Sequence, residues 1–135
     1  MATTFDEALA DFIARCAYVV VAQELATKWR LELVDGYLLD LYFNAMLGKY
    51  SYTLAKDGKR ILGWDNAPHH PALVNFPHHI HQPDGTIARS MLTGQPDQNL
   101  AQVQNFVEVY LDGARGEGPA STACDGGLAQ AVVEN

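Results

Sequence analysis

Apolar residues near the start of the chain repeat at helical spacing. Five of them fall on one face of a helix: Phe5, Leu9, Phe12, Ile13 and Cys16. Thr4 and Glu7 have the spacing of a capping box, in which the two side chains satisfy free backbone N–H groups of the first turn. We therefore predict an amphipathic helix that begins at about Thr4 and packs on the rest of the protein.

The spacing of apolar residues changes to every second position at Trp29. Alternating segments over residues 29–34, 37–44, 49–55 and 60–64 predict four strands. Asp35–Gly36 and the segment 56–59 supply hairpin turns between them. The β-branched residues 19–21 favour a further extended segment. Short connections make neighbouring strands pair, so we expect an antiparallel meander of four or five strands.

Five prolines within residues 66–96 exclude a long helix or a central strand there. This segment is predicted to be a long structured loop, with room for a short strand at Ile80. Asp97 is the predicted N-cap of a second helix, which the apolar spacing after it indicates and which Gly113 should end. The expected fold class is α+β, with two helices covering the meander in one domain of residues 1–112. Residues 113–135 form a glycine-rich tail that we expect to be weakly ordered.

Composition bounds the class of protein. The 135-residue chain has a formal net charge of −7 and two cysteines without metal-site spacing, which we expect to be reduced thiols. It has no apolar run long enough to span a membrane and no signal-peptide pattern, so a cytoplasmic protein without a membrane partner is expected. The middle of the chain is locally basic: Lys49, Lys56, Lys59, Arg60 and Arg89 outnumber its three acids.

All five histidines lie within residues 69–81 of the predicted loop. Histidine is both the commonest metal ligand and the side chain that titrates nearest neutral pH. In an extended segment His79 and His81 share a face, and with His70 they are the candidate ligands if a divalent metal such as zinc is bound. Our main expectation is that no cofactor is needed. A purely structural interpretation is that the imidazoles form hydrogen bonds to backbone groups and thereby hold the loop in place.

General acid–base chemistry needs only one or two imidazoles beside a donor for developing negative charge. His70, His79 and His81 are the candidate catalytic imidazoles, and Lys49 and Arg60 are the candidate donors to a phosphate. Six more residues are candidates for substrate binding: Tyr50, Tyr52, Asp65, Asn66, His69 and His78. The tyrosines could stack on unpaired bases, although aromatic residues at a spacing of two more often pack in a core.

Four motifs follow one another in the middle of the chain: GKYSY at 48–52, KDGKRI at 56–61, WDNAPHH at 64–70 and FPHHIH at 76–81. In this combination the chain resembles the TumE family of toxin–antitoxin proteins, over roughly residues 27–112. It implies a cytosolic toxin whose partner is a DNA-binding, helix-turn-helix antitoxin. It supplies no catalytic residues.

Together, the motifs and the histidines predict a TumE-like toxin that acts on RNA as a metal-independent ribonuclease. The alternative is a non-catalytic module in which the histidine cluster binds a metal or a partner. Exposed strand edges make a homodimer a reasonable expectation.

Overall fold

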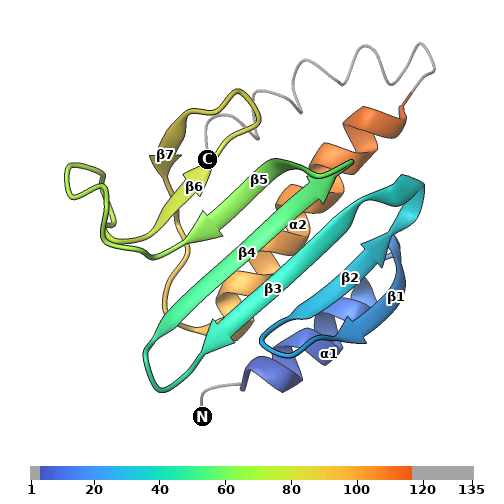
Figure 1. Cartoon of the computed structure of the whole chain (residues 1–135), viewed down its shortest axis with the longest axis horizontal. Helices are drawn as coiled ribbons and strands as arrows, with labels where there is room; N and C mark the ends of the chain where they lie inside the picture. The colour runs from blue at the N-terminus through green and yellow to red at the C-terminus, as the bar shows by residue number, and fades with distance from the viewer. Residues whose placement is uncertain (1–3, 117–135) are drawn as a thin grey trace.

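A computed structural model describes residues 4–116 of the chain. One antiparallel sheet of seven strands lies in front of two helices (Figure 1). The elements follow in the order α1 (Phe5–Arg15), β1 (Val19–Glu24), β2 (Trp29–Leu33), β3 (Leu38–Asn44), β4 (Lys49–Lys56), β5 (Lys59–Asp65), β6 (His79–His81), β7 (Ile87–Arg89) and α2 (Pro96–Arg115), with a short 3-10 turn at Val34–Gly36 between β2 and β3.

The strands lie side by side in sequence order, from β1 to β7. This meander confirms the predicted α+β class, but it has seven strands where four or five were expected. The extra members are short or peripheral. Strand β1 is an exposed edge strand with an irregular register at its start, and β6 and β7 are three residues each. The tightly paired centre is β3, β4 and β5, joined as predicted through residues 45–48 and the Asp57–Gly58 turn.

The two helices differ in how well the sequence predicted their ends. Helix α1 has the complete capping box between Thr4 and Glu7. Helix α2 begins at Pro96 after Gln95, rather than at the predicted cap Asp97, because the fixed φ of proline suits the first helical position. Helix α2 also continues through Gly113 to Arg115. The Nε atom of Arg115 lies 2.9 Å from Asp35 Oδ2, which ties this last turn to the β2–β3 connection.

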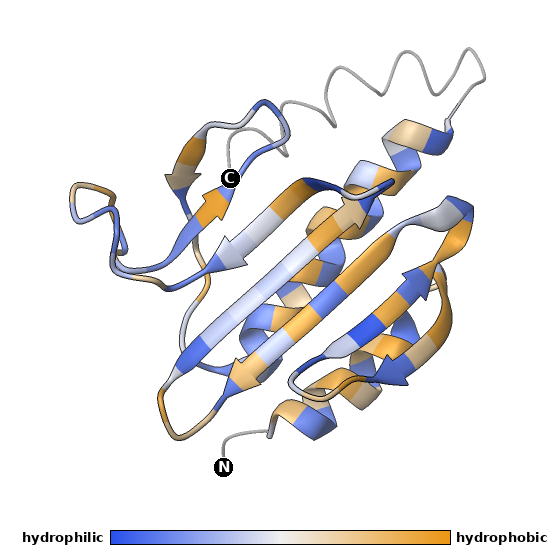
Figure 2. Cartoon of the chain, in the orientation of Figure 1, coloured by the Kyte–Doolittle hydropathy of each residue, from blue (hydrophilic) through white to orange (hydrophobic). Residues whose placement is uncertain are grey.

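The hydrophobic core lies between the helices and one face of the sheet. Alternate residues of the central strands are fully buried there, among them Leu39, Leu41, Tyr52, Leu54, Leu62 and Trp64. Figure 2 shows the corresponding alternation of hydrophobic and hydrophilic positions along β2 and β3. A sheet with one apolar face needs a single cover, and the amphipathic helices α1 and α2 supply it.

The opposite face of the sheet is polar, and no element within residues 4–116 covers it as the helices cover the core face (Figure 1). Asp40 lies on this face in an ion pair with Lys28 and Arg30, each at 2.8 Å. We call it the open face. Strand pairing places one row of side chains across it, in the order Tyr42, Ser51, Asp65, His79 and Arg89.

Two expectations concern the ends of the chain and the membrane. The predicted domain boundary at residue 112 falls inside α2, and residues 117–135 of the glycine-rich tail lie outside the described part of the structure.

Within the described residues, no helix has the length and apolar character needed to cross a membrane.

Candidate functional site

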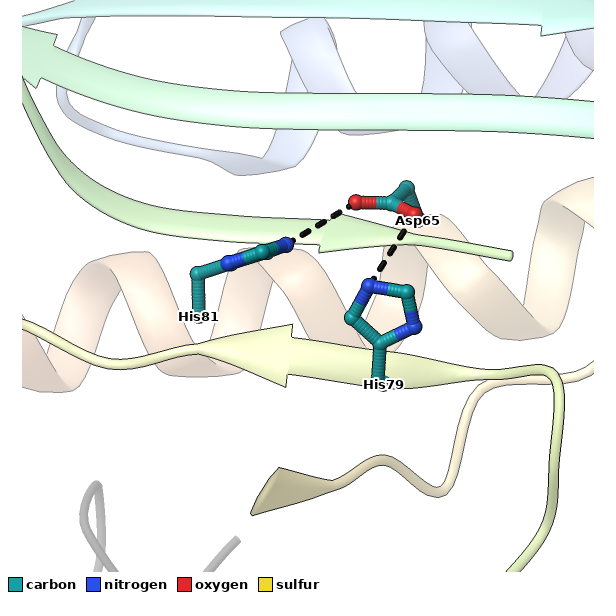
Figure 3. Close-up of side chains that lie close together, drawn as sticks. All are labelled: Asp65, His79 and His81. Carbon is teal, nitrogen blue, oxygen red and sulfur yellow. Dashed lines mark hydrogen bonds and ion pairs between the residues drawn. The ribbon is translucent and has the colours of Figure 1, made fainter. Parts of the chain in front are cut away.

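The pairing of β5 with β6 assembles the histidine site. Proline-rich residues 66–78 leave the sheet after β5 and return so that Asp65 pairs with His79, and Gly63 pairs with His81. Because side chains alternate along a strand, His79 and His81 share the open face while Ile80 enters the core. Figure 3 shows the Asp65 carboxylate between the two imidazoles. We call Asp65, His79 and His81 the carboxylate–histidine cluster.

Asp65 contacts both imidazoles at once. Its Oδ1 atom lies 3.1 Å from His79 Nε2, and its Oδ2 atom lies 3.1 Å from His81 Nε2. The backbone N–H of Ala67 also donates to Oδ1 at 2.9 Å. The carboxylate is therefore held by the loop that follows β5, and it fixes the orientation of two rings from the neighbouring strand.

His79 is the most buried member of the cluster, with 2% of its surface exposed. Its Nδ1 atom lies 3.0 Å from the carbonyl oxygen of Pro77, which can only accept a hydrogen bond. The hydrogen of a neutral ring is thereby assigned to Nδ1, leaving a lone pair on Nε2. Since Nε2 faces the acceptor Oδ1 of Asp65, a proton or a cation must lie between those two atoms.

His81 is more exposed than His79 and lies near the positive charge of Arg60. Burial lowers the pKa of its imidazole from 6.5, the nearby positive charge of Arg60 lowers it further, and the hydrogen bond to Asp65 opposes both effects. The net lowering of the pKa favours the neutral ring. A neutral ring that donates from Nε2 to Asp65 keeps its Nδ1 atom free of a proton.

Gly63 leaves room for Arg60 beside His81. A Cβ atom added at Gly63 would lie 3.0 Å from Arg60 Cδ and 3.7 Å from His81 Cβ. The Arg60 side chain thus lies over Gly63, in space that a larger residue there would fill. This places a guanidinium group on the same side of β5 as His81.

Of the other three histidines, His69 and His70 lie beside the cluster, whereas His78 contacts the core residue Tyr50. His70 packs edge-on against His79 with ring centroids 4.8 Å apart, and the exposed His69 packs in the same way on His70 at 6.4 Å. His78 points the other way, stacks on Tyr50, and shares a 2.7 Å hydrogen bond with its hydroxyl group. Burial lowers the pKa of His78, as does the neighbouring His79.

Three predicted substrate-binding residues have structural contacts instead of a free surface. Tyr50 and Tyr52 are 2% and 0% exposed and stack on each other in the core, where burial raises the pKa of Tyr52 to about 12. Asn66 accepts a hydrogen bond from the Tyr50 backbone and donates one to the Gly48 carbonyl. These positions favour the packing interpretation, and we leave all three out of the proposed site.

Strand pairing also brings to the site Ser51, which the sequence interpretation did not single out, and two basic residues that it did. Ser51 pairs with Asp65 and is exposed, and Arg89 pairs with His79 and is exposed. The predicted Lys49 lies two positions from Ser51 on the same strand, hence on the same face, and is exposed. The sequence identifies Arg89 as a basic residue and a possible donor to negative charge. It does not place Arg89 beside His79, because the short strand β7 gives no periodic signal.

The predicted metal set differs from the group that the structure assembles. Within the described residues, Asp65, His79 and His81 offer ligand atoms that all lie within 4.8 Å of one another. Two predicted ligands, His79 and His81, are in this group, and Asp65 takes the place of His70. The sequence indicates Asp65 as a candidate for substrate binding and as one of several residues near enough to complete a zinc site. Its position opposite His79 depends on the return of the loop.

Comparison with known proteins identifies a family that this chain matches over most of its length. The model of the family described as Toxin TumE matches residues 7–111, which include every strand and both imidazole partners of Asp65. The chain belongs to the TumE toxin family. It is thus the toxin component of a toxin–antitoxin system, and membership implies an antitoxin partner. No curated protein and no solved structure matches the chain significantly.

Proposed function

We propose that this TumE toxin acts in the cytoplasm on RNA, and that it cleaves the RNA backbone by general acid–base chemistry on the open face. The observation that carries the proposal is the contact between Asp65 and His81 at 3.1 Å, next to Arg60. A carboxylate that holds one imidazole nitrogen leaves the other available as a base, an arrangement found in many hydrolytic sites.

The proposed reaction uses the 2′-hydroxyl group of RNA. His81 Nδ1 accepts the proton of this hydroxyl, and the 2′-oxygen forms a bond to the adjacent phosphorus atom. The bond from phosphorus to the 5′-oxygen breaks, and a second imidazole donates a proton to that oxygen. The products are a 2′,3′-cyclic phosphate and a 5′-hydroxyl end. Atoms and charge balance without a cofactor.

Burial and position support the other proposed roles. His79 is too buried to reach a substrate, so it is a positioning residue that fixes Asp65. His70 is half-buried beside His79 and is the candidate proton donor. Arg60 is placed to stabilise negative charge on the phosphate, and the exposed Lys49 and Arg89 extend this basic surface along the open face.

Growth and RNA integrity after induced expression test this proposal. The wild-type protein is expected to arrest growth and to fragment cellular RNA. His81→Gln and Asp65→Asn are expected to do neither, while Asp57→Asn, which removes an equal charge in an exposed turn, acts as the wild type does. All four proteins are checked for folding by circular dichroism. A folded His81→Gln protein that still fragments RNA at the wild-type rate would overturn the proposal.

The proposed partner is a helix-turn-helix antitoxin, as the family resemblance implies, and a homodimer is proposed through the exposed edge strand β1. Strand β1 has unpaired backbone groups along one side and exposed Val20 and Val21. Size-exclusion chromatography with light scattering, with and without co-expressed antitoxin, tests both. A monomeric toxin that does not co-purify with the antitoxin would contradict them.

A further inference from the structure

In the carboxylate–histidine cluster, the contact between His79 Nε2 and Asp65 Oδ1 joins two atoms that both accept hydrogen bonds when the ring is neutral. Pro77 fixes the hydrogen of His79 on Nδ1, so Nε2 presents its lone pair to Asp65 Oδ1 at 3.1 Å. Two bare acceptors repel each other at that distance. A positive centre between them removes the repulsion, and the same carboxylate faces a second Nε2 atom, that of His81.

We propose that Asp65, His79 and His81 form a binding site for one divalent transition-metal ion, with Zn²⁺ as the representative ion. Two imidazoles and a carboxylate match the donors that zinc takes in proteins. They leave a fourth position open to solvent or to a ligand. This inference goes beyond the proposed function, because the metal site can exist whether or not the protein cleaves RNA.

The geometry of the cluster is close to what such an ion requires. Two ligand atoms of a tetrahedral zinc ion, with bonds of about 2.0–2.1 Å, lie about 3.4 Å apart. Asp65 lies 3.1 Å from each imidazole nitrogen, and all three ligand atoms are within 4.8 Å of one another. A small rotation of His81, the more exposed of the two rings, closes the remaining difference.

The surroundings of His79 strengthen the inference. Histidine ligands of metals commonly donate their other N–H group to a backbone carbonyl or a carboxylate, which fixes the ring and its tautomer. The contact of 3.0 Å between His79 Nδ1 and Pro77 O has this form. His79 is almost fully buried, so its Nε2 atom is held in place whether an ion is present or not.

Metal binding and the proposed acid–base chemistry require the ring hydrogen of His81 on different nitrogen atoms. An ion on Nε2 displaces the hydrogen that this nitrogen donates to Asp65, so Nδ1 then carries the ring hydrogen and no longer accepts a proton. The metal-free protein is therefore expected to cleave RNA, and zinc binding is expected to suppress this cleavage. The metal site then acts as an inhibitory site of the toxin.

Zinc binding by purified, chelator-treated protein without a histidine tag tests the site directly. Competition against a chromophoric chelator is expected to give one Zn²⁺ per wild-type chain. Asp65→Asn and His81→Gln are expected to weaken the affinity by at least about tenfold, a loss typical of damage even to the surroundings of a metal ligand. His69→Gln, which removes an exposed histidine outside the cluster, should bind as the wild type does.

Further measurements separate the site from weak binding by the loop and from failures of folding. Zinc should raise the melting temperature of wild-type protein and of His69→Gln but not of Asp65→Asn, since only an intact native site gains stability from the ion. Arg60→Gln, which removes a positive charge near His81, should bind zinc more tightly.

Absence of stoichiometric zinc, or equal binding by folded Asp65→Asn, would overturn the metal site. Unchanged RNA cleavage in zinc-loaded protein would instead contradict the proposed role of His81, and it would leave the metal site standing. The two proposals can therefore fail separately.

Discussion

Replacement of Asp65 by Asn removes the negative charge that holds the two imidazoles. Asn keeps an oxygen for the Ala67 N–H group, so the loop contact survives. The contact of 3.1 Å from His81 Nε2 loses its charged acceptor. In the metal-free protein, with a proton between His79 Nε2 and Asp65 Oδ1, the contact of 3.1 Å from His79 loses it too. Hydrogen bonds to charged groups contribute about 1.5–3 kcal/mol each and neutral ones about 0.5–1.5 kcal/mol. The difference is about 1 kcal/mol per contact.

The two contacts together predict that Asp65→Asn lowers the free energy of unfolding by about 2 kcal/mol. The Asp65 side chain is 22% exposed, so solvent screening weakens both contacts, and the loss of unfolding free energy should not exceed this value. With a urea dependence of about 1–3 kcal/mol per molar, the unfolding midpoint should fall by about 1 M.

Urea unfolding at pH 7, followed by the fluorescence of the buried Trp64, measures this loss. Asp57→Asn is the matched control, since it makes the same charge change in an exposed turn whose positive φ of 54° suits asparagine. Equal midpoints for Asp65→Asn and Asp57→Asn would refute the reasoning, because the carboxylate would then contribute nothing to holding the imidazoles.

Four further predictions follow from the surroundings of the site. Arg60→Gln should raise the pKa of His81, because it removes a charge that lowers it; an NMR titration that shows no change or a fall would contradict this. Gly63→Ala places a Cβ atom 3.0 Å from Arg60 Cδ, so it should displace the Arg60 side chain and slow RNA cleavage with almost no change in the urea midpoint. An unchanged cleavage rate would show that Arg60 takes no part in catalysis. The pKa values of His78 and His81 lie below 6.5 in the folded protein, so the unfolded chain binds more protons below that pH. Stability should be constant above pH 7 and fall as the pH drops below 6.5, which urea midpoints at several pH values will show. A midpoint that rises on acidification would contradict this sign. Asn75→Ala removes two hydrogen bonds from its amide to the Ser90 and Leu92 carbonyls and should cost about 1–3 kcal/mol, against no loss if the loop is held elsewhere.

The sequence predicted the central part of the fold well, because periodicity and turn residues act locally there. The capping box of α1 and the turn at Asp57–Gly58 follow from residues a few positions apart. Strand β1 was recognised only as an extended segment. Its side chains are exposed on both faces for most of its length, so burial imposes no clear alternation on its sequence.

The site was predicted in its residue types but not in its arrangement. The spacing of His79 and His81 correctly placed both on one face, because alternation along a strand is a local property. The contact with Asp65 spans 14 residues from His79, and it depends on where the loop returns to the sheet. No periodic pattern in the proline-rich segment fixes that return. The separation of His78 from its neighbours likewise depends on Tyr50, which lies on another strand.

The most direct test of the central claim is cleavage of a short RNA by purified, metal-free wild-type toxin, compared with 2′-deoxy and 2′-O-methyl versions of the same sequence. We predict fragments that end in a 2′,3′-cyclic phosphate from the RNA alone, and none with His81→Gln. Intact RNA, or cleavage of the 2′-deoxy and 2′-O-methyl strands as well, would contradict attack by the 2′-hydroxyl group at the Asp65–His81 site.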